Sequence, residues 1–380
     1  MSDDFKQKLE AYQKGELRGN DLQAFEEELA MLEVYQTALE QDIDETPKSN
    51  PNIKKQQRIM FKGKWKARFQ SALTVLGLFL VFTFFSSIIT NVYYTWGNPD
   101  RVDVYREIID HTLTITEPFG RYGGTSTHTK AYFGLEATRD LNKVVGRDTI
   151  KVGEMNVNFL FSAMGYPERN NFGTQTQTRA YFSDPRSSEP VWSDWDKLEK
   201  LPEGTVVSAY ISFDDLLETN TVVEMFSERD MDLLWLAVDK GEPNEEDYGA
   251  VFYPIGFPSM PIWHENDMII ESQETENGLF GPRVISESAR SPDYEDDEEQ
   301  FIIHQQFIKT LHFLKEHEKK VNNISYSRLN IEEVLNYIDQ NGIQHYGAVI
   351  TGPTKEILTL QNEPLISQLQ VDEVEFWNWD

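Results

Sequence analysis

Residues 72–94 read ALTVLGLFLVFTFFSSIITNVYY, a run that contains no Asp, Glu, Lys, Arg or His. As a helix with a rise of about 1.5 Å per residue, this run is about 34 Å long and can cross a hydrocarbon core of about 30 Å. Its Phe, Leu, Val and Ile side chains cover every face, whereas a helix in a soluble core keeps a polar stripe. We therefore predict one membrane-spanning helix, over residues 69–96.

Basic side chains crowd the N-terminal side of this run, and only Arg101 and Arg106 lie close beyond its other end. The positive-inside rule predicts that residues 1–68 are cytoplasmic and that residues 97–380 lie outside the cell membrane. The predicted membrane anchors are Lys62, Lys64, Trp65, Lys66 and Arg68 at the inner edge and Tyr93, Tyr94 and Trp96 at the outer edge. A cleaved secretory signal is the alternative, but its apolar region is shorter and lies nearer the N-terminus.

Charge is distributed unevenly along this acidic chain, whose net charge is −29. Residues 47–68 contain eight basic and no acidic side chains, which we interpret as a membrane-surface anchor. DNA binding is the alternative, but the segment lacks a folded reading head. The acidic excess of residues 97–380 argues against nucleic acid as an external ligand. The absence of cysteine excludes disulfides and thiolate chemistry, so one large or two medium external domains must be held by an apolar core.

Residues 1–46 contain the pattern of two short amphipathic helices. Phe5 and Tyr12 share a face of the first helix, Gly15 interrupts it, and Asp21 can cap a second helix that extends to about residue 42. The apolar stripe is too small to form an independent core, so we expect it to lie in a groove on a partner. The alternative is a helical hairpin that packs on itself.

The sequences GEL at residues 15–17 and FEEEL at residues 25–29 resemble the cytoplasmic domain of anti-sigma factors that sequester extracytoplasmic-function sigma factors. In the zinc-binding branch of that family, the helix carries a His-x3-Cys-x2-Cys motif. The same register here holds Glu28, Leu32 and Tyr35, which cannot form the Cys/His zinc site. The segment therefore resembles the zinc-free version of this domain.

Residues 61–120 and 331–360 are similar to the N-terminal and C-terminal regions of the sigma-factor regulator family. The resemblance implies a membrane-bound anti-sigma factor without a cofactor or metal. Its partners would be an extracytoplasmic-function sigma factor, the membrane and an accessory small membrane protein, with no direct nucleic-acid contact. The sigma-contacting residues that we predict are Leu17, Leu22, Phe25, Leu29, Leu32 and Tyr35, with Glu26, Glu27 and Glu28 facing basic side chains of the sigma factor.

The external residues 97–380 show the mixed patterns of an α+β fold. We expect a helix at residues 99–110, then a strand at 112–116, a loop at 121–129 and strands at 130–136, 154–161, 206–213 and 233–238. Residues 221–242 and 333–354 each predict a helix, a polar break and an apolar strand, as a duplicated unit would. Residues 286–299 predict an acidic linker before a long helix at 300–321, whose buried stripe would be Phe301, Ile302, Phe307, Ile308, Leu311 and Leu314.

No set of external residues has the pattern of an active site. Asp214, Asp215 and Glu218 come without a nucleophile and base, and the acidic residues 293–299 lack the ligand spacing of a calcium loop. His304, His312 and His317 are eight and five residues apart, so a helix does not bring them together as metal ligands. Ser86 and Thr90 have the spacing of a small-residue face that pairs membrane helices.

The complete pattern predicts three parts: a helical cytoplasmic N-terminal segment at residues 1–46, one transmembrane helix, and an α+β extracellular domain. We expect a binding protein that represses transcription by holding a sigma factor until an envelope signal releases it. The alternative is a membrane-anchored envelope enzyme or receptor with a cytoplasmic retention tail.

Overall fold

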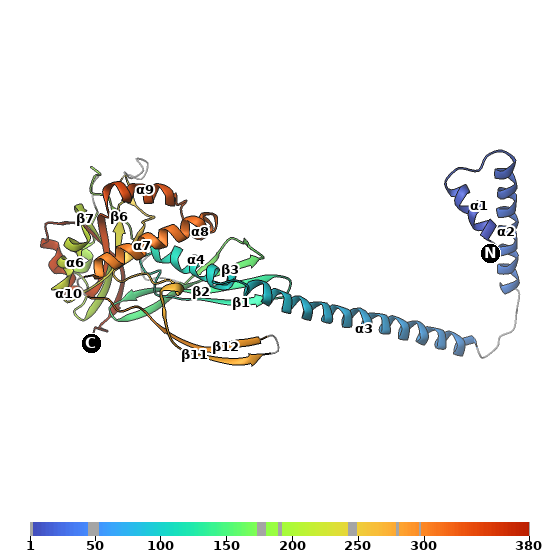
Figure 1. The fold of residues 1–380 in the computed structure, drawn as a ribbon, viewed down its shortest axis with the longest axis horizontal. Helices are drawn as coiled ribbons and strands as arrows, with labels where there is room; N and C mark the ends of the chain where they lie inside the picture. The colour runs from blue at the N-terminus through green and yellow to red at the C-terminus, as the bar shows by residue number, and fades with distance from the viewer. Residues whose placement is uncertain are drawn as a thin grey trace. The chain divides into compact units, whose positions relative to one another are not determined.

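The computed structural model describes residues 3–44, 53–172, 180–188, 192–241, 249–278, 281–295 and 298–379 (Figure 1). The start of the predicted basic anchor, up to residue 52, and residues 296 and 297 of the predicted acidic linker lie outside the described residues. The chain forms two compact units, Met1–Phe79 and Leu80–Asp380. The long helix α3 (Ile53–Tyr94) supplies residues to both units.

The N-terminal unit begins with the two predicted helices, α1 (Asp3–Gln13) and α2 (Asn20–Asp44). Gly15 and Gly19 in the connection have φ angles of 70° and 65°. Glycine adopts this left-handed backbone without steric cost, so these two residues let the chain reverse between the helices. The prediction of a helical N-terminal segment is confirmed.

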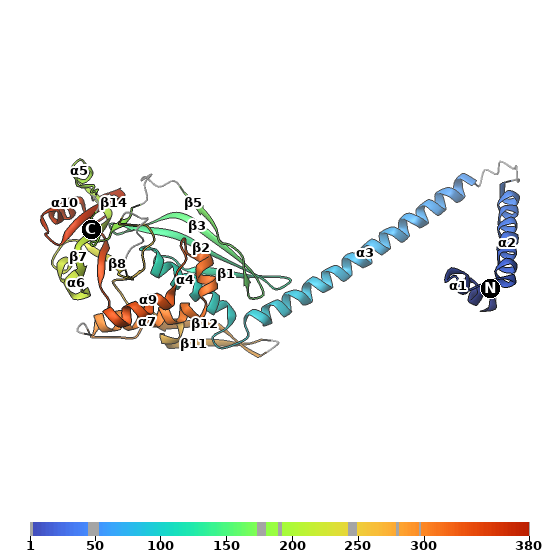
Figure 2. The same cartoon turned by 90° about the horizontal axis from the view of Figure 1, so that it is seen from above.

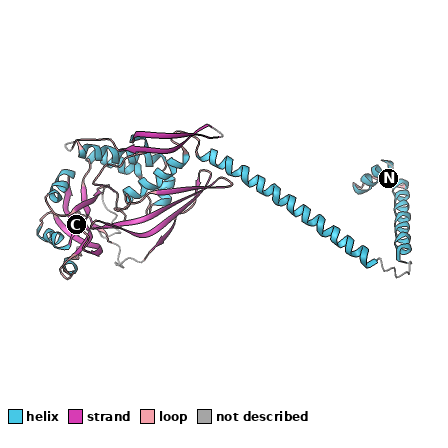
Figure 3. Ribbon diagram, turned by 90° about the horizontal axis from the view of Figure 1, so that it is seen from below, coloured by secondary structure: helices cyan, strands magenta, loops and turns pink. Residues whose placement is uncertain are grey.

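The predicted single apolar helix is also confirmed, as part of α3, which is drawn as one uninterrupted helix in Figure 3. Its 42 residues correspond to about 63 Å, twice the thickness of a hydrocarbon core. The section Lys55–Tyr94 is long and apolar enough to cross a membrane, with a mean hydropathy of 2.3 in its most apolar window. The basic residues before the apolar run therefore continue the same helix.

Helix α4 (Arg101–Thr116) follows directly, and it overturns the prediction of a strand at residues 112–116. Asp100 caps its N-terminus by accepting a hydrogen bond from the backbone N–H of Asp103 at 2.9 Å. The hydroxyl groups of Thr112, Thr114 and Thr116 find acceptors within this helix, because they donate to carbonyl oxygens one turn earlier. Burial of neighbouring apolar side chains in the core outweighs the weak local preference for a strand.

The first sheet contains five antiparallel strands in the order β1-β2-β3-β4, with β5 also paired to β3. Its strands are β1 (Thr125–Lys130), β2 (Gly134–Val145), β3 (Asp148–Leu160), β4 (Ala163–Met164) and β5 (Glu168–Asn171). Strand β3 confirms the prediction at 154–161. The predicted loop at 121–129 is wrong from Thr125 onward, and the predicted strand at 130–136 is interrupted by a turn at residues 131–133.

The second sheet is antiparallel with the order β10-β8-β13-β7-β14. Its strands are β7 (Thr205–Leu217), β8 (Asp232–Val238), β10 (Gly256–Pro258), β13 (His345–Pro353) and β14 (Ile366–Phe376). These confirm the strands predicted at 206–213 and 233–238. Strand β13 is buried along its whole length because both faces of the sheet are covered. Two small pairs, β6 (Phe182–Ser183) with β9 (Ala250–Val251) and β11 (Ile269–Gly278) with β12 (Gly281–Arg290), lie outside both larger sheets.

Helices α6 (Thr219–Ser227) and α9 (Ile331–Asn341) precede β8 and β13, so both predicted helix-strand pairs form. Strands β8 and β13 are antiparallel neighbours in the second sheet. The remaining helical elements are α5 (Trp195–Leu198), η2 (Glu265–Asp267), α7 (Glu299–Glu316), α8 (Glu318–Ile324), α10 (Thr354–Leu358) and η3 (Thr359–Asn362).

Two predictions in this region are wrong. The helix predicted at 300–321 is divided at His317 into α7 and α8, and Phe301 of its predicted buried stripe is 69% exposed. The N-terminal part of the predicted linker, up to Arg290, is strand β12. The side chains of Ser286, Glu287, Ser288 and Arg290 are exposed, so this part of the strand, which pairs with β11, has no alternating apolar pattern.

Helix α4 lies at the centre of the second unit, against β1, β10, α7 and α8 (Figure 2). One apolar core includes Ile108 and Leu113 of α4, Val157 of the first sheet and Ile350 of the second. Helix α4 therefore shares one core with both sheets.

Candidate functional site

The α1–α2 hairpin has a small aromatic core. The ring of Phe25 on α2 is 2% exposed and lies between Phe5 and Tyr12 of α1, with ring centroids 5.6 Å away in both cases. Phe25 is among the residues predicted to contact a partner, and in this structure it stabilises the hairpin. The aromatic residues of α1 cover it because they share one face of that short helix.

Beyond this core, α2 exposes an apolar stripe. Helix α1 has 11 residues and α2 has 25, so α1 covers only part of its neighbour. Leu32, Tyr35 and Leu39 recur at helical spacing and are 44, 67 and 48% exposed. We call these three residues the α2 stripe. An isolated helix face of this kind is suited to bind in a groove on another protein.

The other predicted contact residues precede this stripe in the chain. Leu17, Leu22 and Leu29 are half-buried, and Glu26, Glu27 and Glu28 are exposed. Leu39 was not among the predicted contacts, although its spacing of seven residues from Leu32 was visible in the sequence. Glu28 lies one turn before Leu32 on the face of the stripe, and a carboxylate in that position favours a partner groove with a basic rim.

The predicted membrane anchors have different surroundings. Trp65 and Trp96 are 59% and 71% exposed, as side chains that meet lipid would be, and Lys62, Lys64, Lys66 and Arg68 are exposed on the same helix as Trp65. Tyr93 is half-buried, and its ring lies 4.5 Å from the guanidinium of Arg101. Tyr94 is completely buried inside the protein, so in this structure its ring does not face outward as the rings of Trp65 and Trp96 do.

Tyr94 is buried because the C-terminal end of α3 is bound to two turns of the first sheet. Its hydroxyl donates to the carbonyl oxygens of Phe133 and Phe161 at 2.8 and 3.1 Å. The backbone N–H groups of Tyr132 and Phe133 donate to the hydroxyl oxygens of Ser86 and Thr90, both at 2.8 Å. We call this set of contacts the helix–sheet junction.

The junction stabilises a backbone that L-residues rarely adopt. Tyr132, Phe133 and Phe161 have φ angles of 63°, 61° and 54°, in the left-handed region. Such residues persist where surrounding contacts hold them, and they concentrate at functional sites. Ser86 and Thr90, whose spacing suggested helix pairing, are 8% and 0% exposed, so they serve this junction within one chain.

We predict that replacing both Ser86 and Thr90 by alanine will loosen the turn at residues 131–133. Each buried N–H that loses its acceptor costs about 1 to 3 kcal/mol. The amides of Tyr132 and Phe133 should then exchange with deuterium at least about tenfold faster in full-length protein in lipid nanodiscs. Ser87→Ala is the control because the Ser87 side chain is exposed and its hydroxyl donates within α3, to Thr83. Unchanged exchange in the double variant would contradict the junction.

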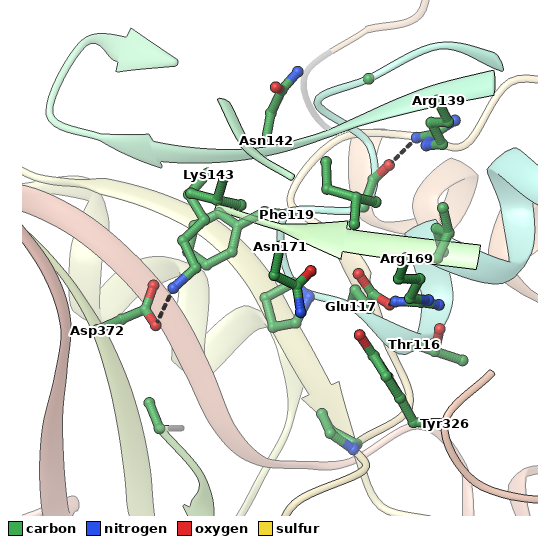
Figure 4. Close-up of a pocket in the computed structure, with 18 of the residues that line it drawn as sticks. Thr116, Glu117, Phe119, Arg139, Asn142, Lys143, Arg169, Asn171, Tyr326 and Asp372 are labelled. Carbon is green, nitrogen blue, oxygen red and sulfur yellow. Dashed lines mark hydrogen bonds and ion pairs between the residues drawn. The ribbon is translucent and has the colours of Figure 1, made fainter. Parts of the chain in front are cut away.

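A cavity of about 500 Å³ opens beside the first sheet (Figure 4). Lys143 points toward Asp372, with a distance of 2.7 Å between Nζ and Oδ1. Arg169 bonds to Glu117 at 2.6 Å and lies over the ring of Tyr326 at 4.0 Å. Burial raises the pKa of the Asp372 carboxyl, and the nearby Lys143 opposes this shift.

These charged groups form pairs inside the protein. Arg139, on the same wall, pairs with Asp110 and donates to the carbonyl oxygen of Gly120. The described residues that line the cavity include no Ser, Cys or His. The described part of the wall therefore lacks a Ser–His or Cys–His pair, one of the usual arrangements of covalent catalysis.

The acidic residues and histidines that the sequence offered as candidate catalytic or metal-binding groups lie apart from one another in the structure. Glu218 occupies the N-cap position of α6, while Asp214 and Asp215 are exposed on β7. His304 bonds to the Thr219 hydroxyl at 2.7 Å, and His312 is exposed on α7. A different set has metal-ligand chemistry, namely Glu107, His111 and His264, whose ligand atoms all lie within 4.8 Å of one another. No pattern in the sequence predicted this set, because His264 is far from the other two residues along the chain.

Comparison with known proteins assigns the chain to a family. The family model described as sigma factor regulator N-terminal matches residues 57–150, and the sigma factor regulator C-terminal model matches residues 198–373. The chain is 28% identical, over 389 residues that cover 100% of both sequences, to the probable anti-sigma-M factor YhdL of Bacillus subtilis (strain 168). No solved structure matches the chain.

The fold and these matches define a regulatory protein with one helix suited to anchor it in a membrane. The chain belongs to the sigma factor regulator family. The N-terminal family model includes most of α3, all of α4 and the part of the helix–sheet junction up to Phe133, whereas Phe161 and the α1–α2 hairpin lie outside both models. The two matches thus include β1 and β2 of the first sheet and most of the second sheet.

Proposed function

We propose that this protein is a single-span anti-sigma factor that sequesters an extracytoplasmic-function sigma factor through its α1–α2 hairpin. The observation that carries the proposal is the α2 stripe, which remains exposed on a folded hairpin. The full-length relative named as a probable anti-sigma-M factor supports it, because its matched length includes the hairpin. The stripe would enter an apolar groove of the sigma factor, and Glu26, Glu27 and Glu28 would meet basic side chains at the rim.

In this proposal the hairpin is cytoplasmic and the α+β domain is external. The charge asymmetry around α3 supports this orientation. The external domain would sense the envelope or bind an accessory small membrane protein. The helix–sheet junction supplies a direct mechanical link, since it joins the end of α3 to two turns of the first sheet. A change in the external domain could thereby shift or rotate α3 and alter access to the hairpin.

We predict the orientation as a measurable result. A reporter that is active only in the cytoplasm should work when inserted at residue 40 of the full chain, and one that is active only outside should work when inserted at residue 150. The reason is that the basic side chains preceding the apolar run are retained on the cytoplasmic side. The opposite pair of activities would reverse the roles of the hairpin and the α+β domain.

The proposal itself is tested by capture of a sigma factor from membranes that contain the full chain. The wild-type protein should retain an extracytoplasmic-function sigma factor, and variants of the α2 stripe should lose it. A wild-type chain that retains no sigma factor would remove the basis of the proposed function.

A further inference from the structure

We propose that Glu107, His111 and His264 form a site for one transition-metal dication of the zinc class in the α+β domain. Glu107 and His111 lie one turn apart on α4, so their side chains share a face of that helix. His264 comes from the segment immediately before η2. The three ligand atoms lie within 4.8 Å of one another.

His111 is the ligand that the fold leaves without another role. Its side chain is buried, with 6% exposure of the residue, and its Nε2 has no hydrogen-bond partner among the described residues. A buried polar atom without a partner is costly, and a bound metal would satisfy it. Burial lowers the pKa of His111 to about 3, with His264 and Lys309 adding to the effect, so the ring is neutral and has a lone pair.

The hydrogen bonds of His264 determine which of its nitrogens has the lone pair. The Thr310 hydroxyl donates its single proton to the carbonyl oxygen of Gln306 at 2.8 Å, so it accepts from Nε2–H of His264 at 2.9 Å. The lone pair is therefore on Nδ1. The backbone N–H of Asp267 can donate to Nδ1 of His264, and it also donates to the carbonyl oxygen of His264 at 2.9 Å. This N–H therefore keeps a hydrogen-bond acceptor when Nδ1 binds a metal. A hydrogen bond from the second ring nitrogen is the usual support of a metal-binding histidine.

Glu107 supplies the third ligand and a negative charge. One oxygen, Oε1, accepts a hydrogen bond from the backbone N–H of Glu265 at 2.8 Å, which orients the carboxylate. Burial raises the pKa of Glu107, and a dication beside it would favour the ionised form. Two imidazoles and one carboxylate are a common protein donor set for zinc, with a water as the fourth ligand.

The surroundings allow a small ion to enter and bind. A cavity of about 380 Å³ is lined by Glu107 and His111 and gives access for the ion and a water ligand. Zinc ligands lie about 3.3 Å apart around the metal, so side-chain shifts of about 1 Å are needed. Lys309, which forms an ion pair with Asp267, is one opposing charge, and Arg106, Arg121 and Arg139 also line this cavity. The imidazoles favour zinc, cobalt or nickel over magnesium or calcium, which prefer oxygen ligands.

A bound metal would connect α4 to the segment that enters β11. Helix α4 begins shortly after α3 ends, and β11 starts five residues after His264. The site would thus fasten the first element after the membrane helix to a segment more than 150 residues later in the chain.

The experiment uses untagged full-length protein in detergent micelles, first treated with EDTA and then dialysed. Calorimetry should show one Zn²⁺ bound per chain, and Co²⁺ should produce the visible absorption of a site with nitrogen ligands. Zn²⁺ in hundredfold excess over its dissociation constant should raise the thermal unfolding midpoint by about 5 °C or more. Mg²⁺ should neither bind in calorimetry nor raise the thermal unfolding midpoint.

His111→Gln and Glu107→Gln keep side-chain size and should each weaken Zn²⁺ binding at least about tenfold. His312→Gln is the matched control, because His312 is an exposed histidine on α7. The metal-free unfolding midpoint of each variant shows whether it folds. If the variant of the buried His111 does not fold, the Glu107 variant provides the comparison with the wild type. Absence of Zn²⁺ binding by the wild type, or equal binding by wild type and a folded site variant, would overturn the proposal.

Discussion

Replacing Leu32 and Tyr35 together by alanine is expected to release the sigma factor and to raise transcription from its promoters without envelope stress. These side chains are 44% and 67% exposed in the free hairpin, so a partner can bury most of their apolar surface. Truncating both should cost about 3 to 5 kcal/mol of binding free energy, a loss of about a hundredfold to several thousandfold in affinity. The affinity can be measured with full-length protein in nanodiscs and the captured sigma factor.

Val34→Ala is the control for this experiment. Val34 is also exposed, at 69%, but it lies nearly opposite Leu32 on α2 at about 100° of rotation per residue. It should change affinity by less than about threefold and leave promoter activity unchanged. Full affinity in the double variant, or an equal loss with Val34→Ala, would show that the α2 stripe is not the contact surface.

Phe25→Ala should have a comparably large effect for a different reason. The ring is 2% exposed between Phe5 and Tyr12, and truncating a buried Phe costs about 3 to 5 kcal/mol. A two-helix hairpin has little more stability than this, so we expect it to unfold. Trypsin should then cleave at Arg18 at least about tenfold faster in the full-length variant than in the wild type.

The comparison variant for this prediction is Tyr35→Ala. It also removes an aromatic ring from α2, but from an exposed position, so cleavage at Arg18 should proceed at the wild-type rate. Rapid cleavage in both variants would mean that Tyr35 holds the hairpin together and does not belong to a binding surface. Slow cleavage in both would show that the Phe25 core is not needed for the fold.

The two predictions divide residues that the sequence placed in one group. Periodicity put Phe25 and Leu32 on the same face of a helix, and both were expected to contact the partner. The lengths of α1 and α2 determine the difference, because Phe25 lies where α1 can cover it and Leu32 remains exposed. Periodicity identifies a face, but it does not identify what covers that face.

Secondary structure was predictable where local preference and burial agreed. The apolar strands β7 and β8 formed as expected, since β-branched and apolar residues occupy buried positions there. Residues 112–116 have the same composition but complete helix α4, whose threonine hydroxyls bond to the preceding turn. Strand β12 was missed because both of its faces carry polar or charged residues.

The sequence by itself determined that one helix is suited to cross a membrane and that two amphipathic helices precede it. Both properties are sums over neighbouring residues, and hydropathy or periodicity measures such sums directly. Only the tertiary structure showed that Tyr94 is bound to Phe133 and Phe161, and that His264 lies beside Glu107 and His111. These contacts join residues far apart in the chain, and their energies depend on how the two sheets and α4 pack, which no local pattern records.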